Sequence, residues 1–147
     1  MECTVSWTGA TGARSAMGFV AETGSGHVIA IDGAPDADKP ENGGQNLAPR
    51  PMETVLAGTG ACSAYDVVLI LKRGRHDVRG CTVKVTSERA PVDPKVFTKI
   101  HMHFTVQGSV PAAAVERAIA LSHEKYCSAT IMLGKTAAIS TSFEVMA

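Results

Sequence analysis

The chain has 147 residues, in which 14 Lys and Arg balance 14 Asp and Glu, and 45% of its residues are hydrophobic. This length suits a single domain over residues 1–147, and the apolar content can fill a core, which excludes a mainly disordered chain. Zero net charge argues against nucleic-acid binding, which usually needs a basic patch. No apolar run approaches the ~20 residues of a membrane span, and no signal-peptide pattern is present, so we expect a cytoplasmic protein with no membrane partner.

The first third of the sequence predicts three short β-strands joined as hairpins. Residues 3–7, 18–21 and 27–31 are short runs typical of strands, and Gly and Ser residues separate them. Residues 32–50 follow as a loop rich in Gly and Pro. A loop of this length in a compact domain is either functional or mobile.

A helix is predicted from about residue 51 to residue 71. Pro51 suits its first turn, Glu53 is favourable at the positive end of the helix dipole, and Gly74 follows two basic residues at the end. Small or apolar side chains cover almost every side of the segment. This pattern is typical of a helix in the centre of a fold.

The second half of the sequence predicts two long strands, a helix and a final strand. The strands span residues 78–88 and 97–106, and the helix runs from 109 to about 125. A short apolar segment at 129–133 and a strand at 138–145 complete the chain. The order βββ-α-ββ-α-β belongs to the α+β class.

Four cysteines raise the question of thiol chemistry, and none forms a C-x-x-C pair, so we expect free thiols. Cys62 lies among small residues that leave space beside its sulfur, although a Cys in an apolar helix is often inert. Cys127 lies at a break between helical segments, where a helix N-terminus and Lys125 favour the thiolate. Cys81 lies on the apolar face of a strand, where burial raises the thiol pKa. Cys3 belongs to the first strand.

Other titratable residues give weaker signals. His101 and His103 share one strand face, but no third ligand stands at a fixed spacing, so we predict no metal site and no cofactor. Asp66 lies inside the apolar helix and needs hydrogen-bond partners, and we interpret it as structural rather than catalytic. Glu53 lies nine residues before Cys62, on a different helix face, and is interpreted as a helix-start carboxylate or one that meets a loop or a partner.

Two segments resemble motifs of the OsmC/Ohr family. Residues 51–68, PMETVLAGTGACSAYDVV, are similar to its central-helix signature, and residues 122–128, SHEKYCS, to its second cysteine motif. Trp7, the hairpin at 24–26 and Asp32 resemble its N-terminal half, and residues 86–89 its middle strand. The resemblance covers nearly the whole chain and is strongest to the YhfA-like branch of the family.

The resemblance implies an α+β OsmC-like fold and an intertwined homodimer, with its central helices buried and two active sites at the subunit interface. In the family's peroxidases the first cysteine attacks the peroxide and becomes a sulfenic acid, which the second resolves as a disulfide. This implies that Cys62 is the peroxidatic cysteine and Cys127 the resolving one. The implied partners are an organic hydroperoxide and a dithiol reductant.

The family's peroxidases also use an Arg and a Glu beside the first cysteine. Arg14 is the nearest candidate for the Arg, and Glu53 lies one position after the family's Glu, where this chain has Met52. A thiolate at Cys62 needs a facing cation because an unpaired buried charge is strongly disfavoured. Arg50, just before the helix, is the second candidate for that cation.

Three functions are compatible with these residues. The first is a thiol-dependent hydroperoxide reductase. The second is a non-enzymatic dimer that binds a small apolar ligand or senses oxidants without turnover. The third is a structural dimer in which both cysteines are core residues. Rapid loss of the Cys62 thiol with hydroperoxide separates the first from the others.

Overall fold

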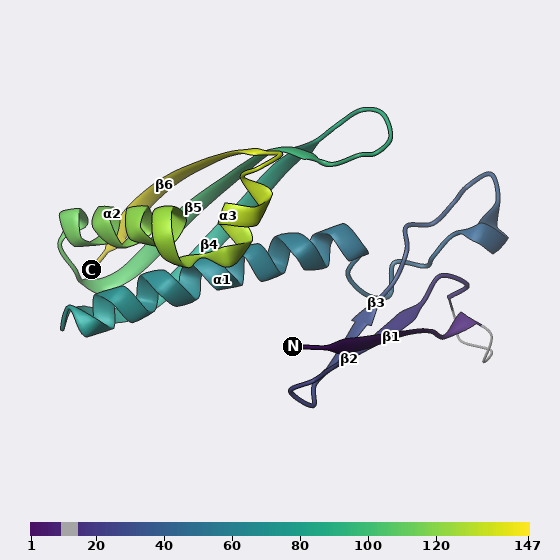
Figure 1. Cartoon of the computed structure of the whole chain (residues 1–147), viewed down its shortest axis with the longest axis horizontal. Helices are drawn as coiled ribbons and strands as arrows, with labels where there is room; N and C mark the ends of the chain where they lie inside the picture. Colours follow the sequence, from purple (N-terminus) through teal and green to yellow (C-terminus); the bar gives the residue numbers. More distant parts are fainter. Residues whose placement is uncertain (10–14) are drawn as a thin grey trace. The chain divides into compact units, whose positions relative to one another are not determined.

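The computed structural model describes residues 1–9 and 15–147, and it divides into two compact units, Met1–Val55 and Leu56–Ala147. The prediction of one domain over the whole chain stays a prediction. The α+β class and the element order agree with the sequence (Figure 1). The elements are β1 (Cys3–Trp7), β2 (Phe19–Thr23), β3 (Val28–Ile31), the 3-10 turn η2 (Pro40–Asn42), α1 (Pro51–Arg73), β4 (Asp77–Arg89), β5 (Phe97–Ser109), α2 (Ala112–Leu121), the π-helical turn η3 (Ser122–Tyr126), α3 (Ser128–Leu133) and β6 (Ala138–Met146).

The N-terminal unit, Met1–Val55, is built on an antiparallel sheet in the order β1–β2–β3, which confirms the predicted hairpins. The sheet has almost no apolar core. Among the described residues of this unit, Ala21 is the only buried apolar side chain, while Val5, Trp7 and Val28 are more than half exposed. Apolar burial therefore contributes little to this unit within one chain.

A buried carboxylate organises the loop between β3 and α1. Asp32 accepts hydrogen bonds from Ser15 Oγ (2.5 Å) and from the backbone N–H groups of Gly33 (2.7 Å), Gln45 (3.2 Å) and Leu47 (2.9 Å). These donors favour the charged form and lower the pKa of Asp32 to about 2. The long loop predicted from the sequence is thus tied to one side chain.

The C-terminal unit, Leu56–Ala147, holds the apolar core. Its sheet has the order β4–β5–β6, with β4 and β5 antiparallel and β5 and β6 parallel. A parallel pair needs a crossover connection, which α2, η3 and α3 supply (Figure 1). The inward side chains of β5 are fully buried: Ile100, Met102, Phe104 and Val106. The crossover places the second cysteine motif against this core.

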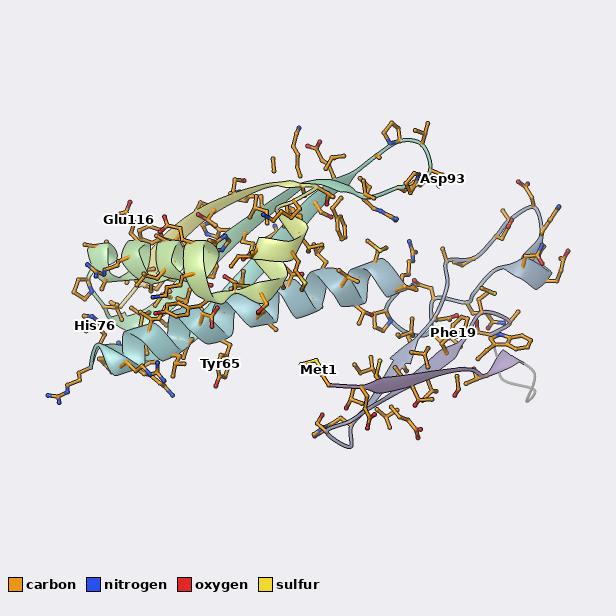
Figure 2. The ribbon with its side chains drawn as sticks, viewed as in Figure 1. Met1, Phe19, Tyr65, His76, Asp93 and Glu116 are labelled. Carbon is orange, nitrogen blue, oxygen red and sulfur yellow. The ribbon has the colours of Figure 1, made fainter. Side chains whose placement is uncertain are left out.

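One stripe of α1 faces the core. Its buried residues are Thr59, Gly60, Ser63, Val67 and Leu71. A Cβ at position 60 would lie 2.8 Å from Val85 Cγ2, so glycine lets the helix approach β4 closely. On the other side of the helix, Ala57, Ala61 and Tyr65 are exposed, and Tyr65 projects away from the sheet (Figure 2). The central helix is therefore buried along one stripe of the single chain.

The length and composition of α1 would also allow it to cross a membrane, with a mean hydropathy of 1.6 in its most apolar window. This corrects the expectation that no such segment exists in the sequence. The difference arises because an average over 18 residues tolerates the small and polar residues, including Asp66, that interrupt the continuous apolar run. A single such helix is weak evidence for a membrane span, since the core helix of a soluble protein passes the same test.

Candidate functional site

Two cysteines and a carboxylate meet inside the C-terminal unit. The sulfur atoms of Cys62 and Cys127 and a carboxylate oxygen of Asp66 all lie within 4.8 Å of one another. Cys62 and Asp66 are one helical turn apart on α1, which places both side chains on the same face. Cys62 is half-buried and Cys127 is fully buried. The structure thus brings together two thiols that stand 65 positions apart in the sequence.

The chain around Cys127 is fixed by its turn. The Cys127 N–H donates to the carbonyl of Ser122 (2.7 Å), and its own carbonyl accepts from the Ile131 N–H and from Thr130 Oγ1, both at 3.1 Å. Cys127 is therefore the C-cap of the wide turn η3 and the N-cap of α3. Single π-helical turns occur often at functional sites, and this one turns Cys127 toward α1.

Burial raises the pKa of the Cys127 thiol above its ordinary value. Hydrogen bonds from the hydroxyl and the N–H of Thr130 oppose this shift, and the neighbouring Cys62 thiol adds to it. The sequence-based prediction of a lowered pKa at this helix N-terminus is wrong. The reason is that α3 has only six residues, and complete burial outweighs its dipole. At neutral pH Cys127 is therefore a thiol.

A chain of polar side chains lies beside the two sulfurs and connects α1 with η3. Ser122 Oγ donates to Asp66 Oδ2 (3.2 Å), Ser63 Oγ lies 3.2 Å from Ser122 Oγ, and His123 Nε2 lies 3.2 Å from Ser63 Oγ. Ser63 and Ser122 are fully buried. Each hydroxyl has one proton to donate, and this limit fixes the direction of the chain.

Because Ser122 gives its proton to Asp66, Ser63 donates to Ser122, and His123 Nε2–H donates to Ser63. The chain ends on the Asp66 carboxylate as the common acceptor. Burial lowers the pKa of His123, and the Asp66 charge opposes that shift. The imidazole is packed edge-on against Phe104, with ring centroids 6.4 Å apart. We therefore assign a neutral His123 with its proton on Nε2.

This polar cluster was not predicted from the sequence, which pointed only to a structural Asp66. Two segments of the sequence contain polar residues that indicate this cluster. Cys62, Ser63 and Asp66 form a polar patch at positions i, i+1 and i+4 of an otherwise apolar helix segment, and Ser122 and His123 stand just before the second cysteine. Polar residues on a buried helix face require partners, and these two groups satisfy each other.

The supporting residues predicted from the sequence lie in the N-terminal unit or outside the described residues. Glu53 accepts a hydrogen bond from the Arg50 N–H (2.9 Å), and Arg50 Nη2 donates to Asn46 Oδ1 (3.3 Å). Glu53 is thus a helix-start carboxylate, as one of the two interpretations held. Arg14 falls within residues 10–14, outside the described part of the chain.

The other two cysteines differ from the pair. Cys3 is exposed on β1, and Cys81 is half-buried on β4. Burial raises the pKa of Cys81, which confirms the prediction for this thiol. Neither joins the cluster of Cys62, Asp66 and Cys127.

A small cavity of about 230 Å³ opens beside Asp66. Its walls are largely apolar, with Arg73 and Tyr126 adding polar groups; the full lining is Asp66, Leu69, Ile70, Arg73, Leu121 and Tyr126. A cavity of this kind suits a small, mostly apolar molecule, and Asp66 is the residue that it shares with the cysteine cluster.

Two thiols and a carboxylate are also donors that a thiophilic metal uses. Structural zinc sites take four protein ligands, and within residues 1–9 and 15–147 no fourth His, Cys, Asp or Glu joins this group. His101 and His103, the other metal candidates, bond to Ser142 at 2.9 and 2.8 Å. Among the described residues, the group therefore lacks the four protein ligands of a structural zinc site.

An α+β fold in which a central helix presents one cysteine to a second cysteine on a crossover defines a two-cysteine protein of the OsmC-like class. The family model described as "OsmC-like protein" matches residues 43–142. The chain belongs to this family.

Relatives agree with this assignment. The chain is 50% identical to Protein YhfA of Escherichia coli (strain K12) over 130 residues. This aligned region covers 88% of this chain and 90% of the relative. A hypothetical protein from Aquifex aeolicus VF5 has a TM-score of 0.76 and 27% identity, covering 99% and 97% of the two chains. A structure named as an organic hydroperoxide resistance protein OsmC from Legionella pneumophila has a TM-score of 0.68 at 16% identity, covering 98% and 97%, which shows the shared fold.

Proposed function

We propose that this chain reduces organic hydroperoxides, with Cys62 as the peroxidatic and Cys127 as the resolving cysteine. The observation that carries the proposal is the approach of the two sulfurs to within 4.8 Å. A disulfide needs about 2.05 Å between its sulfurs, so its formation requires the two sulfurs to move closer by less than about 3 Å. A pair poised in this way is the usual arrangement for reversible thiol oxidation.

The different burial of the two thiols supports their separate roles. Cys62 is half-buried, so a peroxide can reach it. Cys127 is fully buried and its pKa is raised, so it remains a protonated thiol, which is a weak nucleophile. It reacts only once the neighbouring Cys62 sulfur is oxidised. Cys62 therefore reacts first and Cys127 second.

The proposed cycle balances in three steps. The Cys62 sulfur attacks the outer oxygen of the hydroperoxide, the O–O bond breaks, and Cys62 becomes a sulfenic acid while the alcohol leaves. The Cys127 sulfur then attacks the Cys62 sulfur and releases water, which leaves a disulfide. A dithiol reductant restores both thiols by exchange and is itself oxidised to a disulfide.

A cation near Cys62 would favour its thiolate and polarise the peroxide. Arg14 and Arg50 are the proposed sources of this charge, and Glu53 is the proposed carboxylate partner. These three assignments come from the family resemblance and from the need to balance a partly buried charge.

We also propose that the chain works as a homodimer. The exposed stripe of α1 carries small residues, Ala57 and Ala61, which allow a second helix to approach closely, and Tyr65 is 70% exposed. An open groove of about 570 Å³ lies along this stripe and reaches Cys81. Covering such a face with a second copy would give the core-like interface of an obligate dimer. Sedimentation should show a dimer, and a stable monomer at micromolar concentration would contradict this.

The names of related structures point toward peroxide detoxification, since the Legionella pneumophila structure is named for organic hydroperoxide resistance. Four free thiols suit a reducing compartment, which makes the cytoplasm the proposed location. The second candidate function is binding of a small apolar ligand, or oxidant sensing without turnover, and the cavity beside Asp66 favours it.

Turnover separates these functions. Purified protein with a dithiol reductant and an excess of an alkyl hydroperoxide should consume many equivalents of peroxide. Cys62→Ser should abolish consumption, while Cys81→Ser, the matched loss of a half-buried thiol, should keep it. Binding of the hydroperoxide or its alcohol without consumption by the wild type would favour the ligand-binding function.

A further inference from the structure

The resolving step requires that Cys127 lose a proton. The thiolate is the nucleophile in thiol–disulfide chemistry, but Cys127 has no exposed surface, and burial raises its pKa. Bulk water is therefore not the obvious acceptor. The leaving hydroxide of the Cys62 sulfenic acid needs a proton at the same moment, so a single group near both sulfurs could serve both ends of the reaction.

Asp66 is placed to do this. Its carboxylate lies within 4.8 Å of both sulfurs, and Ser122 Oγ holds one of its oxygens at 3.2 Å. The chain from His123 through Ser63 and Ser122 donates toward this carboxylate and restricts its position. Holding a group in the reactive geometry before the reaction is a large part of what enzymes contribute.

The other titratable groups around Asp66 do not meet these conditions. His123, from η3, uses its Nε2–H to donate to Ser63. Arg73 from α1 and Tyr126 from η3 line the cavity beside Asp66, and an Arg is no proton acceptor at neutral pH. Among the described His, Cys, Asp and Glu side chains, Asp66 is the one that shares the cluster with both thiols.

We propose that Asp66 is the proton relay of the resolving step, taking the proton from the Cys127 thiol and delivering it to the hydroxide that leaves Cys62. The proposal rests on the proposed peroxidase function and goes beyond it in naming the residue that moves the proton. It replaces the purely structural role predicted from the sequence.

The step balances without an added reactant. The Cys127 S–H bond breaks, its electron pair forms the S–S bond, and the proton passes to an Asp66 oxygen. The S–O bond of Cys62 breaks, its oxygen leaves with the electron pair, and Asp66 returns the proton to it, which gives water. Asp66 ends the step as it began.

A carboxylate beside Cys62 has the opposite effect on the first step. Its negative charge disfavours a neighbouring thiolate, so removing the charge should leave sulfenic acid formation unchanged or make it faster. General acid–base catalysis contributes about 10²- to 10⁴-fold. Asp66→Asn should therefore slow resolution by at least about 10-fold while sparing the first step, a split that simple misfolding would not produce.

The experiment is a rapid-quench time course on reduced full-length protein with one equivalent of an alkyl hydroperoxide. Dimedone trapping and mass spectrometry measure the Cys62 sulfenic acid, and non-reducing peptide mapping measures the Cys62–Cys127 disulfide. The variants are Asp66→Asn, Asp66→Glu as the conservative change, and Glu124→Gln as the loss of an exposed carboxylate. Cys127→Ser marks the signal expected when resolution is blocked.

At pH 7, Asp66→Asn should accumulate sulfenic acid, Asp66→Glu should recover part of the rate, and Glu124→Gln should match the wild type. As pH rises, hydroxide replaces the missing base, and the Asp66→Asn rate should approach the wild-type rate. Resolution by Asp66→Asn at the wild-type rate at pH 7 would overturn the relay and leave the peroxidase intact. Slow resolution at every pH would show a misplaced Cys127 and also overturn the relay. No sulfenic acid in Cys127→Ser, where resolution is blocked, would remove the peroxidase itself.

Discussion

The two units of the chain are stabilised by different physics. In the C-terminal unit, fully buried apolar side chains such as Phe104, Val67 and Leu71 fill the space between sheet and helices. In the N-terminal unit the central buried group is a carboxylate, Asp32, which accepts four hydrogen bonds, three from the backbone of a long loop and one from Ser15. Cys62 and Cys127, the thiols proposed to react, thus lie in the unit that has its own apolar core.

The same comparison accounts for what each unit leaves exposed. The N-terminal sheet exposes Val5, Trp7 and Val28, and the C-terminal unit exposes one stripe of α1. Apolar surface of this kind on a small chain usually marks an interaction site. The proposed homodimer would provide the burial that the N-terminal unit lacks within one chain.

The largest expected effect is a loss of core in the C-terminal unit. Phe104→Ala removes a ring that is 0% exposed and should lower the free energy of unfolding by about 3–5 kcal/mol. Val28→Ala, on the exposed N-terminal sheet, should change it by less than about 0.5 kcal/mol in the monomer. Chemical denaturation of both variants tests the contrast, and a large loss for Val28→Ala would show that another surface covers β3.

A smaller loss is expected in the polar chain behind the cysteines. Ser122→Ala removes the hydroxyl that donates to the half-buried Asp66 and accepts from the fully buried Ser63. Unsatisfied buried polar groups cost about 1–3 kcal/mol each. Ser87→Ala on β4 is the exposed control and should have almost no effect. Equal stability of the two variants in thermal unfolding would mean that this hydrogen-bond chain contributes nothing to stability.

The next effect is confined to the loop around Asp32. Asp32→Asn should increase hydrogen exchange at the amides of Gln45 and Leu47, which now donate to the carboxylate, and leave β5 unchanged. Asp36→Asn, at an exposed acceptor of two other N–H groups, is the matched control. Loss of protection across β5 as well would show that the two units do not open independently.

The same carboxylate gives the N-terminal loop a pH dependence of known sign. Its hydrogen-bond donors lower the pKa of Asp32 in the folded chain to about 2, from an ordinary value of 3.8. Because the pKa of Asp32 is lower in the folded than in the unfolded chain, its carboxylate stabilises the fold fully at any pH above the unfolded pKa. This contribution is lost as the pH falls from about 4 toward 2. Carbon-detected NMR titration of Asp32 should show the low midpoint. An ordinary midpoint would contradict the four-donor geometry.

The smallest effect is a difference in reactivity without any loss of stability. Cys3 is exposed, whereas burial raises the pKa values of Cys81 and Cys127. Iodoacetamide at pH 7 should therefore modify Cys3 before Cys81 and leave Cys127 until last. Mass mapping of a time course gives the order directly, and early labelling of Cys127 would show that its site opens in solution.

Much of the fold was predictable because its elements carry local signals. The alternation of β5 and the Gly-ended, apolar α1 gave the order of elements, and the family resemblance paired Cys62 with Cys127. The spacing of 65 residues between Cys62 and Cys127 does not by itself predict that they meet. The parallel β5–β6 pairing and its crossover bring the second cysteine to α1.

Two features of the site, the pKa of Cys127 and the neighbours of Asp66, were not predicted from the sequence. In both cases the deciding effect depends on tertiary packing, which the sequence does not show directly. A helix start and a nearby Lys suggested a low pKa for Cys127, but complete burial, which depends on tertiary packing, has the larger effect. Asp66 looked structural because Ser122 and the two sulfurs become its neighbours only in the folded unit.

The central claim is that Cys62 and Cys127 form one redox pair inside the C-terminal unit. The most direct measurement is non-reducing peptide mapping after a stoichiometric pulse of an organic hydroperoxide, followed by reduction with a dithiol. We expect a reversible Cys62–Cys127 disulfide, with Cys3 and Cys81 still reduced. A disulfide to Cys3 or Cys81, or a Cys62 that oxidises without ever linking to Cys127, would contradict it.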